Sequence, residues 1–344
     1  MKFNKKDLIE MERCYTVEPV KIEGKNGFAF ASDGENGEGI AFVGDNFKDK
    51  EVLWENAGGC MGIKQIPGKE NEFLTIHEFY LKNSPSFSKI VWLKKSADKW
   101  IKKDLIHFPF IHRMDIVEKD NTKYVVFATI SHFKKDRDDW ELPGAVYAFK
   151  LPEDYSEDFY INPTLIFEGL YINHGYFNNG KGQLYFSGDQ GVVELNLVDS
   201  HLENWKTFII YEEPASDILL YDLDKDGEEE LVKIDNFHGN TVRILKKDSK
   251  GEYKEQFSYS HGAEIIHGLS VIEIEDTPTL VVSTRKGTAE LITVQYKEKK
   301  YIKEVIDSGF GPINVATANF DDEIYIAAAH HTTDKATVYK LDMR

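Results

Sequence analysis

The stretch Ser216-Asp217-Ile218-Leu219-Leu220-Tyr221-Asp222-Leu223-Asp224-Lys225-Asp226-Gly227 predicts a short β-strand followed by a tight turn. The apolar run suits a strand, and the Asp and Gly residues after it suit a turn. Further apolar runs follow at 230–234, 241–245 and 253–259. Four short strands joined by turns are the unit of a β-propeller blade.

The same pattern recurs along the 344-residue chain. The run Lys5-Lys6-Asp7-Leu8-Ile9, for example, returns as Lys102-Lys103-Asp104-Leu105-Ile106. The starts of the units lie 43 to 62 residues apart, a spacing typical of propeller blades. We predict an all-β fold, a seven-bladed β-propeller with four-stranded antiparallel blades, as one domain spanning 1–344. The residues just before each first strand are Tyr15, Met61, His112, His174, Asp217, His267 and Asn314.

The two ends of the chain predict how the ring closes. The last unit has strands near 315–318, 324–327 and 336–339, but no fourth strand follows. Residues 3–10 precede the first unit and have the pattern of a fourth strand. We therefore expect the N-terminal strand to complete the last blade, which removes an exposed edge where the ring joins.

Composition excludes several classes of partner. The chain has 42 Lys and Arg residues against 59 Asp and Glu residues, a formal net charge of −17. Such a charge repels phosphate backbones and anionic lipids, so we expect neither nucleic acid nor a membrane as partner. Two cysteines, Cys14 and Cys60, make no disulfide framework. With no signal-like or membrane-spanning apolar run, a cytoplasmic location is expected.

The order of strands in a blade predicts which loops meet. Strand direction alternates, so the connection into strand one and the loop between strands two and three share one face of the ring. Eight of the eleven histidines fall at these positions. Imidazoles gathered at the mouth of the channel predict an acid–base or metal site. They are His112, His174 and His267 before first strands, and His77, His132, His238, His330 and His331 after second strands.

The unit at 216–244 resembles the FG-GAP or VCBS-type propeller repeat in its Asp-Leu-Asp-x-Asp-Gly turn followed by an apolar strand. The chain is also similar to the propellers of aldos-2-ulose dehydratase and of ulvan lyases, which carry His, Tyr and Arg at the mouth. His112-Arg113 and Asn173-His174-Gly175 carry this likeness. The resemblance implies a lyase or dehydratase acting on a small sugar, oligosaccharide or uronate.

Elimination of this kind needs a base, an acid and a positive charge that stabilises an enolate. His112 or His174 is the candidate base, and Tyr15 or His267 the candidate acid. Arg285 is the candidate for neutralising a carboxylate or enolate. One divalent metal of unspecified identity is a further source of charge, and metal-assisted hydrolysis is then the alternative reaction. The candidate metal ligands are His132, His238 and His331; the candidate ligand-binding residues are Asp217, Asp235, Asn314, His77 and His330.

A non-catalytic carbohydrate- or protein-binding propeller is the second hypothesis, because a fold does not determine a function. Several imidazoles within about 4 Å of one point would favour a metal site, and histidines spread singly around the rim would favour plain binding.

Two other segments need an interpretation. Asp222, Asp224 and Asp226 resemble the start of an EF-hand loop, but a strand rather than a helix follows them, so bound calcium is not expected there. The charged insertion 134–143 follows His132 and is expected to overhang the histidine face, with Trp140 as a candidate wall.

Overall fold

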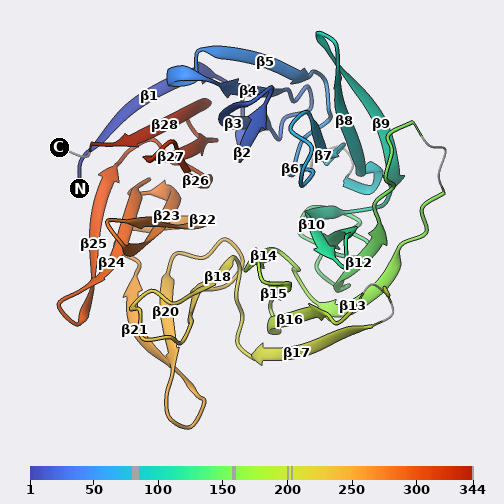
Figure 1. Cartoon of the computed structure of the whole chain (residues 1–344). Helices are drawn as coiled ribbons and strands as arrows, with labels where there is room; N and C mark the ends of the chain where they lie inside the picture. Colours follow the sequence, from blue (N-terminus) through green and yellow to red (C-terminus); the bar gives the residue numbers. More distant parts are fainter. Residues whose placement is uncertain (80–84, 157–159, 200, 203, 343–344) are drawn as a thin grey trace.

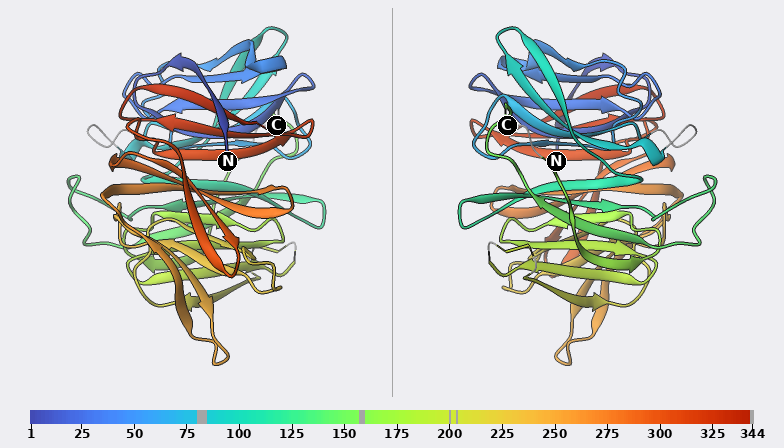
Figure 2. Two further views of the ribbon diagram at one scale, coloured as in Figure 1. Left: turned by 90° about the vertical axis from the view of Figure 1, so that its left-hand side faces the viewer. Right: turned by 90° about the vertical axis from the view of Figure 1, so that its right-hand side faces the viewer.

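The computed structural model describes residues 1–79, 85–156, 160–199, 201–202 and 204–342. In these residues the chain forms seven four-stranded antiparallel sheets, arranged as blades around a central channel (Figure 1). The predicted seven-bladed propeller is therefore confirmed. Figure 2 shows the ring edge-on from two sides.

Each of the first three blades runs in chain order from the channel outward. The first blade holds β2 (Cys14–Ile22), β3 (Lys25–Ser32), β4 (Gly39–Val43) and β5 (Asp49–Trp54). The second holds β6 (Gly62–Gln65), β7 (Glu72–His77), β8 (Lys89–Ser96) and β9 (Lys99–His107). The third holds β10 (Ile111–Lys119), β11 (Thr122–Thr129), β12 (Gly144–Lys150) and β13 (Thr164–Leu170).

The next three blades repeat this order. The fourth holds β14 (Gly175–Asn178), β15 (Gln183–Gly188), β16 (Gly191–Leu197) and β17 (Trp205–Tyr211). The fifth holds β18 (Ile218–Tyr221), β19 (Glu230–Ile234), β20 (Val242–Lys247) and β21 (Tyr253–Tyr259). The sixth holds β22 (Ala263–Ile274), β23 (Thr277–Gly287), β24 (Leu291–Lys297) and β25 (Lys300–Asp307).

The seventh blade closes the ring as predicted. It combines β26 (Asn314–Phe320), β27 (Glu323–His330) and β28 (Lys335–Leu341) with β1 (Phe3–Glu10), which pairs antiparallel with β28. Asp7 adds side-chain bonds across this pair, to Lys335 Nζ at 2.7 Å and Thr337 Oγ1 at 2.9 Å. Phe3 consequently pairs with Leu341, which brings the first and the last strand of the chain side by side (Figure 1).

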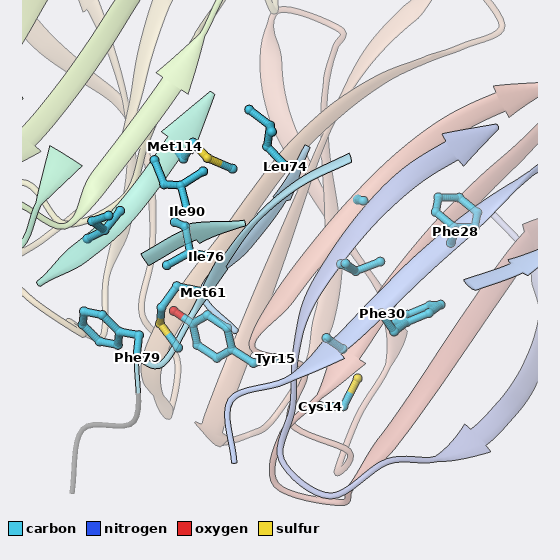
Figure 3. Packing of buried hydrophobic residues seen from close by; sticks show 14 of the residues in the cluster. Cys14, Tyr15, Phe28, Phe30, Met61, Leu74, Ile76, Phe79, Ile90 and Met114 are labelled. Carbon is cyan, nitrogen blue, oxygen red and sulfur yellow. The ribbon is translucent and has the colours of Figure 1, made fainter. Parts of the chain in front are cut away.

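Alternation along the inner strands builds the core between blades. In β3, Phe28 and Phe30 face one neighbouring blade, whereas Ala29 and Ala31 face the other. Successive side chains of a strand point to opposite faces, so the first blade offers a large-residue face to one neighbour and a small-residue face to the other. Burying one such Phe contributes about 2 to 3 kcal/mol. Figure 3 shows this packing around Phe28, Phe30, Leu74 and Ile76.

Helix is almost absent from the described part of the chain, where η1 (Asp45–Phe47) and η2 (Pro85–Phe87) are single 3-10 turns. Neither these turns nor any other described helix has the length and apolar character needed to cross a bilayer.

Candidate functional site

A cavity of about 370 Å³ opens at one end of the channel, on the face predicted from the loop order. Its walls come from the connections into first strands and from the loops after second strands. Tyr15, Met61 and Phe79 form part of its apolar wall and lie close together in Figure 3. The remaining lining residues are Arg13, Asp33, His112, Ile130, Arg137, Asp138, Trp140, His174, Phe237, His238, Ile265, Arg285, Lys286, Ile313 and His331.

Three of the predicted site residues sit at irregularities of their first strands. The register with the second strand shifts around Tyr15 in β2, around His112 in β10 and around His267 in β22. A β-bulge inserts a residue that has no partner opposite it and re-aims that side chain. The strands therefore begin earlier than predicted, and the bulges place these three side chains at the channel mouth.

An imidazole cluster forms the floor of the cavity. The ring of His174 lies 4.8 Å from that of His112, 4.9 Å from that of His267 and 5.2 Å from that of His238, between centroids. His112, His174 and His267 are almost fully buried, whereas His238 is half-buried and stacks on Phe237 at 3.9 Å. One nitrogen each from His174, His238 and His267 lies within 4.8 Å of the others, a grouping that could hold a metal ion.

Burial keeps these imidazoles neutral. Desolvation, with a smaller contribution from Arg113, holds the pKa values of His112 and His174 well below the ordinary value of 6.5. Desolvation also lowers the pKa of His267 well below that value, although Asp217 opposes the shift. The pKa of His238 falls to about 4 for the same reason. At neutral pH the unprotonated nitrogens can therefore accept hydrogen bonds or bind a metal cation.

Asp217 and Arg113 close the channel below the cluster. Arg113 donates to Asp217 Oδ1 at 2.9 Å and to the His174 carbonyl at 2.8 Å. The other Asp217 oxygen lies 3.2 Å from His174 Nδ1 and 4.0 Å from His267 Nδ1. Asp217 thus lies behind the cluster and lines the channel rather than the cavity, so its predicted role as a ligand-binding residue stays a prediction.

A second network links Arg13, Asp33, His331 and Arg285 along one wall of the cavity. Arg13 holds Asp33 with two bonds of 2.7 and 3.0 Å. His331 Nε2 lies 3.2 Å from Asp33, and Arg285 Nη2 donates to His331 Nδ1 at 3.0 Å. Both nitrogens of His331 are therefore engaged. Arg285 Nε is buried and has no hydrogen-bond partner among the described residues.

Asp217, His267 and Asn314 line the channel beneath this cavity, and four further predicted site residues belong to the described lining of neither. His77 is buried against Trp54 and bonds Thr75 at 2.9 Å. Three other residues have partners elsewhere: His330 lies 3.4 Å from the Tyr339 hydroxyl, His132 lies 3.5 Å from Glu168, and Asp235 pairs with Lys233 and Arg243 at 2.9 and 2.6 Å.

Four further residues line the cavity although no sequence pattern indicated them as site residues: Arg13, Phe79, Arg137 and Phe237. Arg137 belongs to the insertion 134–143, whose predicted position over the histidine face agrees with the placement of Trp140 in the cavity wall. Phe237 stands next to His238, a neighbour the loop pattern could have indicated. Arg13 and Phe79 carry no comparable signal.

The acidic turn of the fifth blade is paired with the ammonium group of Lys246. Lys246 Nζ lies 2.6 Å from Asp224, 2.7 Å from Asp226 and 2.8 Å from the fully buried Glu230. These carboxylates raise the pKa of Lys246 above its ordinary value, although burial opposes the shift. The ammonium group therefore stands among the oxygens that a calcium ion would need.

Comparisons with known proteins agree on the fold alone. No family model and no curated protein matches the chain, so the FG-GAP/VCBS and sugar-eliminase resemblance stays a prediction. Among solved structures, a chain of the mitotic checkpoint complex superposes with a TM-score of 0.61 at 9% identity, covering 98% of this chain and 93% of its own. A chain of the crystal structure of BBS1N in complex with ARL6DN superposes with a TM-score of 0.56 at 12% identity, covering 100% of this chain and 98% of its own. At these identities, the likeness supports the propeller architecture.

Proposed function

We propose that this chain is a non-catalytic protein-binding propeller whose cavity takes up an acidic group of a partner. The observation that carries the proposal is Arg285, whose buried Nε lacks a hydrogen-bond partner among the described residues. A buried donor left unpaired costs about 1 to 3 kcal/mol, and a carboxylate in the cavity would recover this energy once the Arg285 guanidinium turns to expose its Nε. The cavity of about 370 Å³ has room for a side chain or a chain end.

The charge around the cavity favours an acidic ligand. Arg13, Arg137, Arg285 and Lys286 line it, within a chain whose formal net charge is −17. Elsewhere on such a surface an acidic segment meets net repulsion. The cavity would therefore determine where and in what orientation the partner docks.

Aromatic side chains in the cavity wall also suit the binding of a protein partner. Trp140 and Phe237 lie 5.2 Å apart at the cavity, between ring centroids, and Lys134 lies over the Trp140 ring. Trp and Arg side chains in partly enclosed pockets contribute most of the binding energy at many protein interfaces.

The structural comparisons add support of a general kind. Both similar chains come from structures described as complexes, one of the mitotic checkpoint and one of BBS1N with ARL6DN. A propeller of this shape can therefore present a surface to another protein.

A sugar- or uronate-acting lyase is the second candidate, and the imidazole cluster favours it. His112 and His174 are neutral because burial lowers both pKa values, so either could act as a base. Tyr15 is buried, with its pKa raised, and its protonated hydroxyl lies 3.4 Å from His267 Nε2. A uronate carboxylate would meet the same arginines.

A binding selection separates the two candidates. Random peptides displayed on phage are selected on the wild-type chain, and oligouronates are incubated with it while ultraviolet absorbance reports unsaturated product. We expect Asp- and Glu-rich peptides, no product, and an affinity loss of about 30-fold in Arg285→Gln. The control Lys181→Gln removes an exposed charge paired with Glu229 and should bind like wild type. Enrichment of neutral or basic peptides, or turnover of a uronate, would overturn the proposal.

A further inference from the structure

The geometry points to a three-histidine site for a divalent transition metal, zinc first, formed by His174, His238 and His267. The three residues come from the connection into β14, the loop after β19 and the bulge in β22. His174 and His238 line the cavity, and His267 lines the channel directly beneath it. The site therefore lies where the cavity meets the channel.

The hydrogen bonds of Asn314 determine the protonation of His267. The Asn314 amide nitrogen donates to the Tyr15 carbonyl at 2.8 Å, so its oxygen is the atom that lies 3.1 Å from His267 Nδ1. An oxygen acceptor there requires a proton on Nδ1. Nε2 of His267 is then the unprotonated nitrogen, and its lone pair faces the Tyr15 hydroxyl at 3.4 Å, a contact that a bound metal ion would replace.

The surroundings of His174 lead to the same result. Its Nδ1 lies 3.2 Å from Asp217 Oδ2 and 3.2 Å from Ser216 Oγ. Asp217 is itself held by Arg113 through its other oxygen, at 2.9 Å. Asp217 Oδ2 makes no hydrogen bond among the described residues, but its negative charge near Nδ1 favours a proton on that nitrogen, which leaves Nε2 as the candidate ligand. Metal-binding histidines typically have such a carboxylate or amide partner behind them.

The imidazole ring of His238 is the one that can move to shorten the spacing between the ligand nitrogens when a metal binds. Zinc bonds of about 2.1 Å at tetrahedral angles place donor nitrogens about 3.4 Å apart. The present spacing, within 4.8 Å, must therefore shorten on binding. His238 is half-buried, and the described hydrogen bonds include none to its imidazole, so its ring can turn toward the other two.

Three imidazoles and an open fourth position suit zinc, cobalt, nickel or copper, and they suit calcium and magnesium poorly. His174 and His238 line the cavity, so a carboxylate or water held there could complete the coordination. The inference does not rest on the proposed protein-binding function, because a metal can bind whether or not a partner does.

Zinc and cobalt binding to the purified full chain test the inference. After treatment with a chelator, the protein is titrated with ZnCl₂ by calorimetry and with CoCl₂ by visible absorbance. We expect one zinc per chain and the intense absorption of four-coordinate cobalt. His238→Ala and His267→Gln should each lower zinc affinity about 100-fold or more.

The control is His201→Ala, which removes an exposed histidine of the fourth blade and should bind zinc like wild type. Should His267→Gln fail to fold, as judged by circular dichroism, the half-buried His238 decides the outcome. The absence of zinc binding, or equal zinc affinity in wild type and His238→Ala, would overturn the inference. Failure of peptide binding with zinc binding intact would reject only the proposed function.

Discussion

The Asn314 side chain donates to the carbonyl of Tyr15 at 2.8 Å, across 299 residues of sequence. Asn314 begins the first strand of the seventh blade, and Tyr15 sits on the bulge of the first blade. The same amide orients His267 in the sixth blade. One side chain therefore links three blades at the joint of the ring and sets the geometry of the site.

Replacing this amide should weaken the ring. We expect Asn314→Ala to lower the free energy of unfolding by about 1 to 3 kcal/mol, because the Tyr15 carbonyl and His267 Nδ1 each lose a partner. Urea denaturation measures the change. Asn319→Ala, at an exposed position of the same strand, is the matched control and should stay within about 0.5 kcal/mol of wild type. Equal losses in both variants would contradict this role of Asn314.

Ring closure by β1 can be tested by deletion. Removing residues 1–10 leaves β28 as an unpaired edge and should lower the midpoint of thermal unfolding by roughly 10 °C. A synthetic peptide of residues 1–12 added in trans should restore part of the loss, whereas a scrambled peptide should not. A truncated chain as stable as wild type would show that closure contributes little.

The buried His77 makes stability depend on pH. Burial, with smaller effects from Lys102 and Lys89, lowers its pKa from 6.5 to about 3. Between these values the unfolded chain binds the additional proton, so the free energy of unfolding falls as the pH drops below about 6.5. His77 contributes about 1.4 kcal/mol per pH unit to this slope.

His77→Gln should remove that contribution while keeping a partner for Thr75. Urea denaturation at pH 7, 6 and 5 measures both slopes, and His201→Gln serves as the exposed-histidine control. Parallel curves for wild type and His77→Gln would contradict the assignment of the shift to His77.

Lys246 should be replaceable by a divalent cation. Lys246→Gln leaves Asp224, Asp226 and the buried Glu230 without their counter-ion and should cost about 3 kcal/mol. Millimolar calcium should raise the melting temperature of this variant but not that of wild type. Lys247→Gln, the adjacent lysine, is the control. A variant indifferent to calcium would show that the turn cannot hold a cation in this geometry.

The sequence predicted the blades because their signal is local. Apolar runs followed by turns, such as 216–227, recur at blade spacing, and residues 3–10 matched the strand that the last blade lacked. The face of the ring followed from strand direction alone. Strand direction thus predicted that His112, His174, His238 and His267 lie on one face, and the structure brings their rings together.

The features that the sequence did not predict, the β-bulges and some side-chain directions, depend on tertiary packing. A bulge depends on the register between two strands, so nothing local indicated that Tyr15, His112 and His267 would sit on register shifts. Loop order placed His77 and His330 on the correct face, but it did not predict the direction in which their side chains point. His77 packs against Trp54 of the neighbouring first blade, and His330 packs against Tyr339 of its own blade.

A crystal structure with a selected acidic peptide bound tests the central claim most directly. The account predicts a carboxylate inside the cavity, within hydrogen-bond reach of Arg285 Nε, with Trp140 and Phe237 against the peptide. Peptide density on another face of the ring, with the cavity filled only by water, would contradict it.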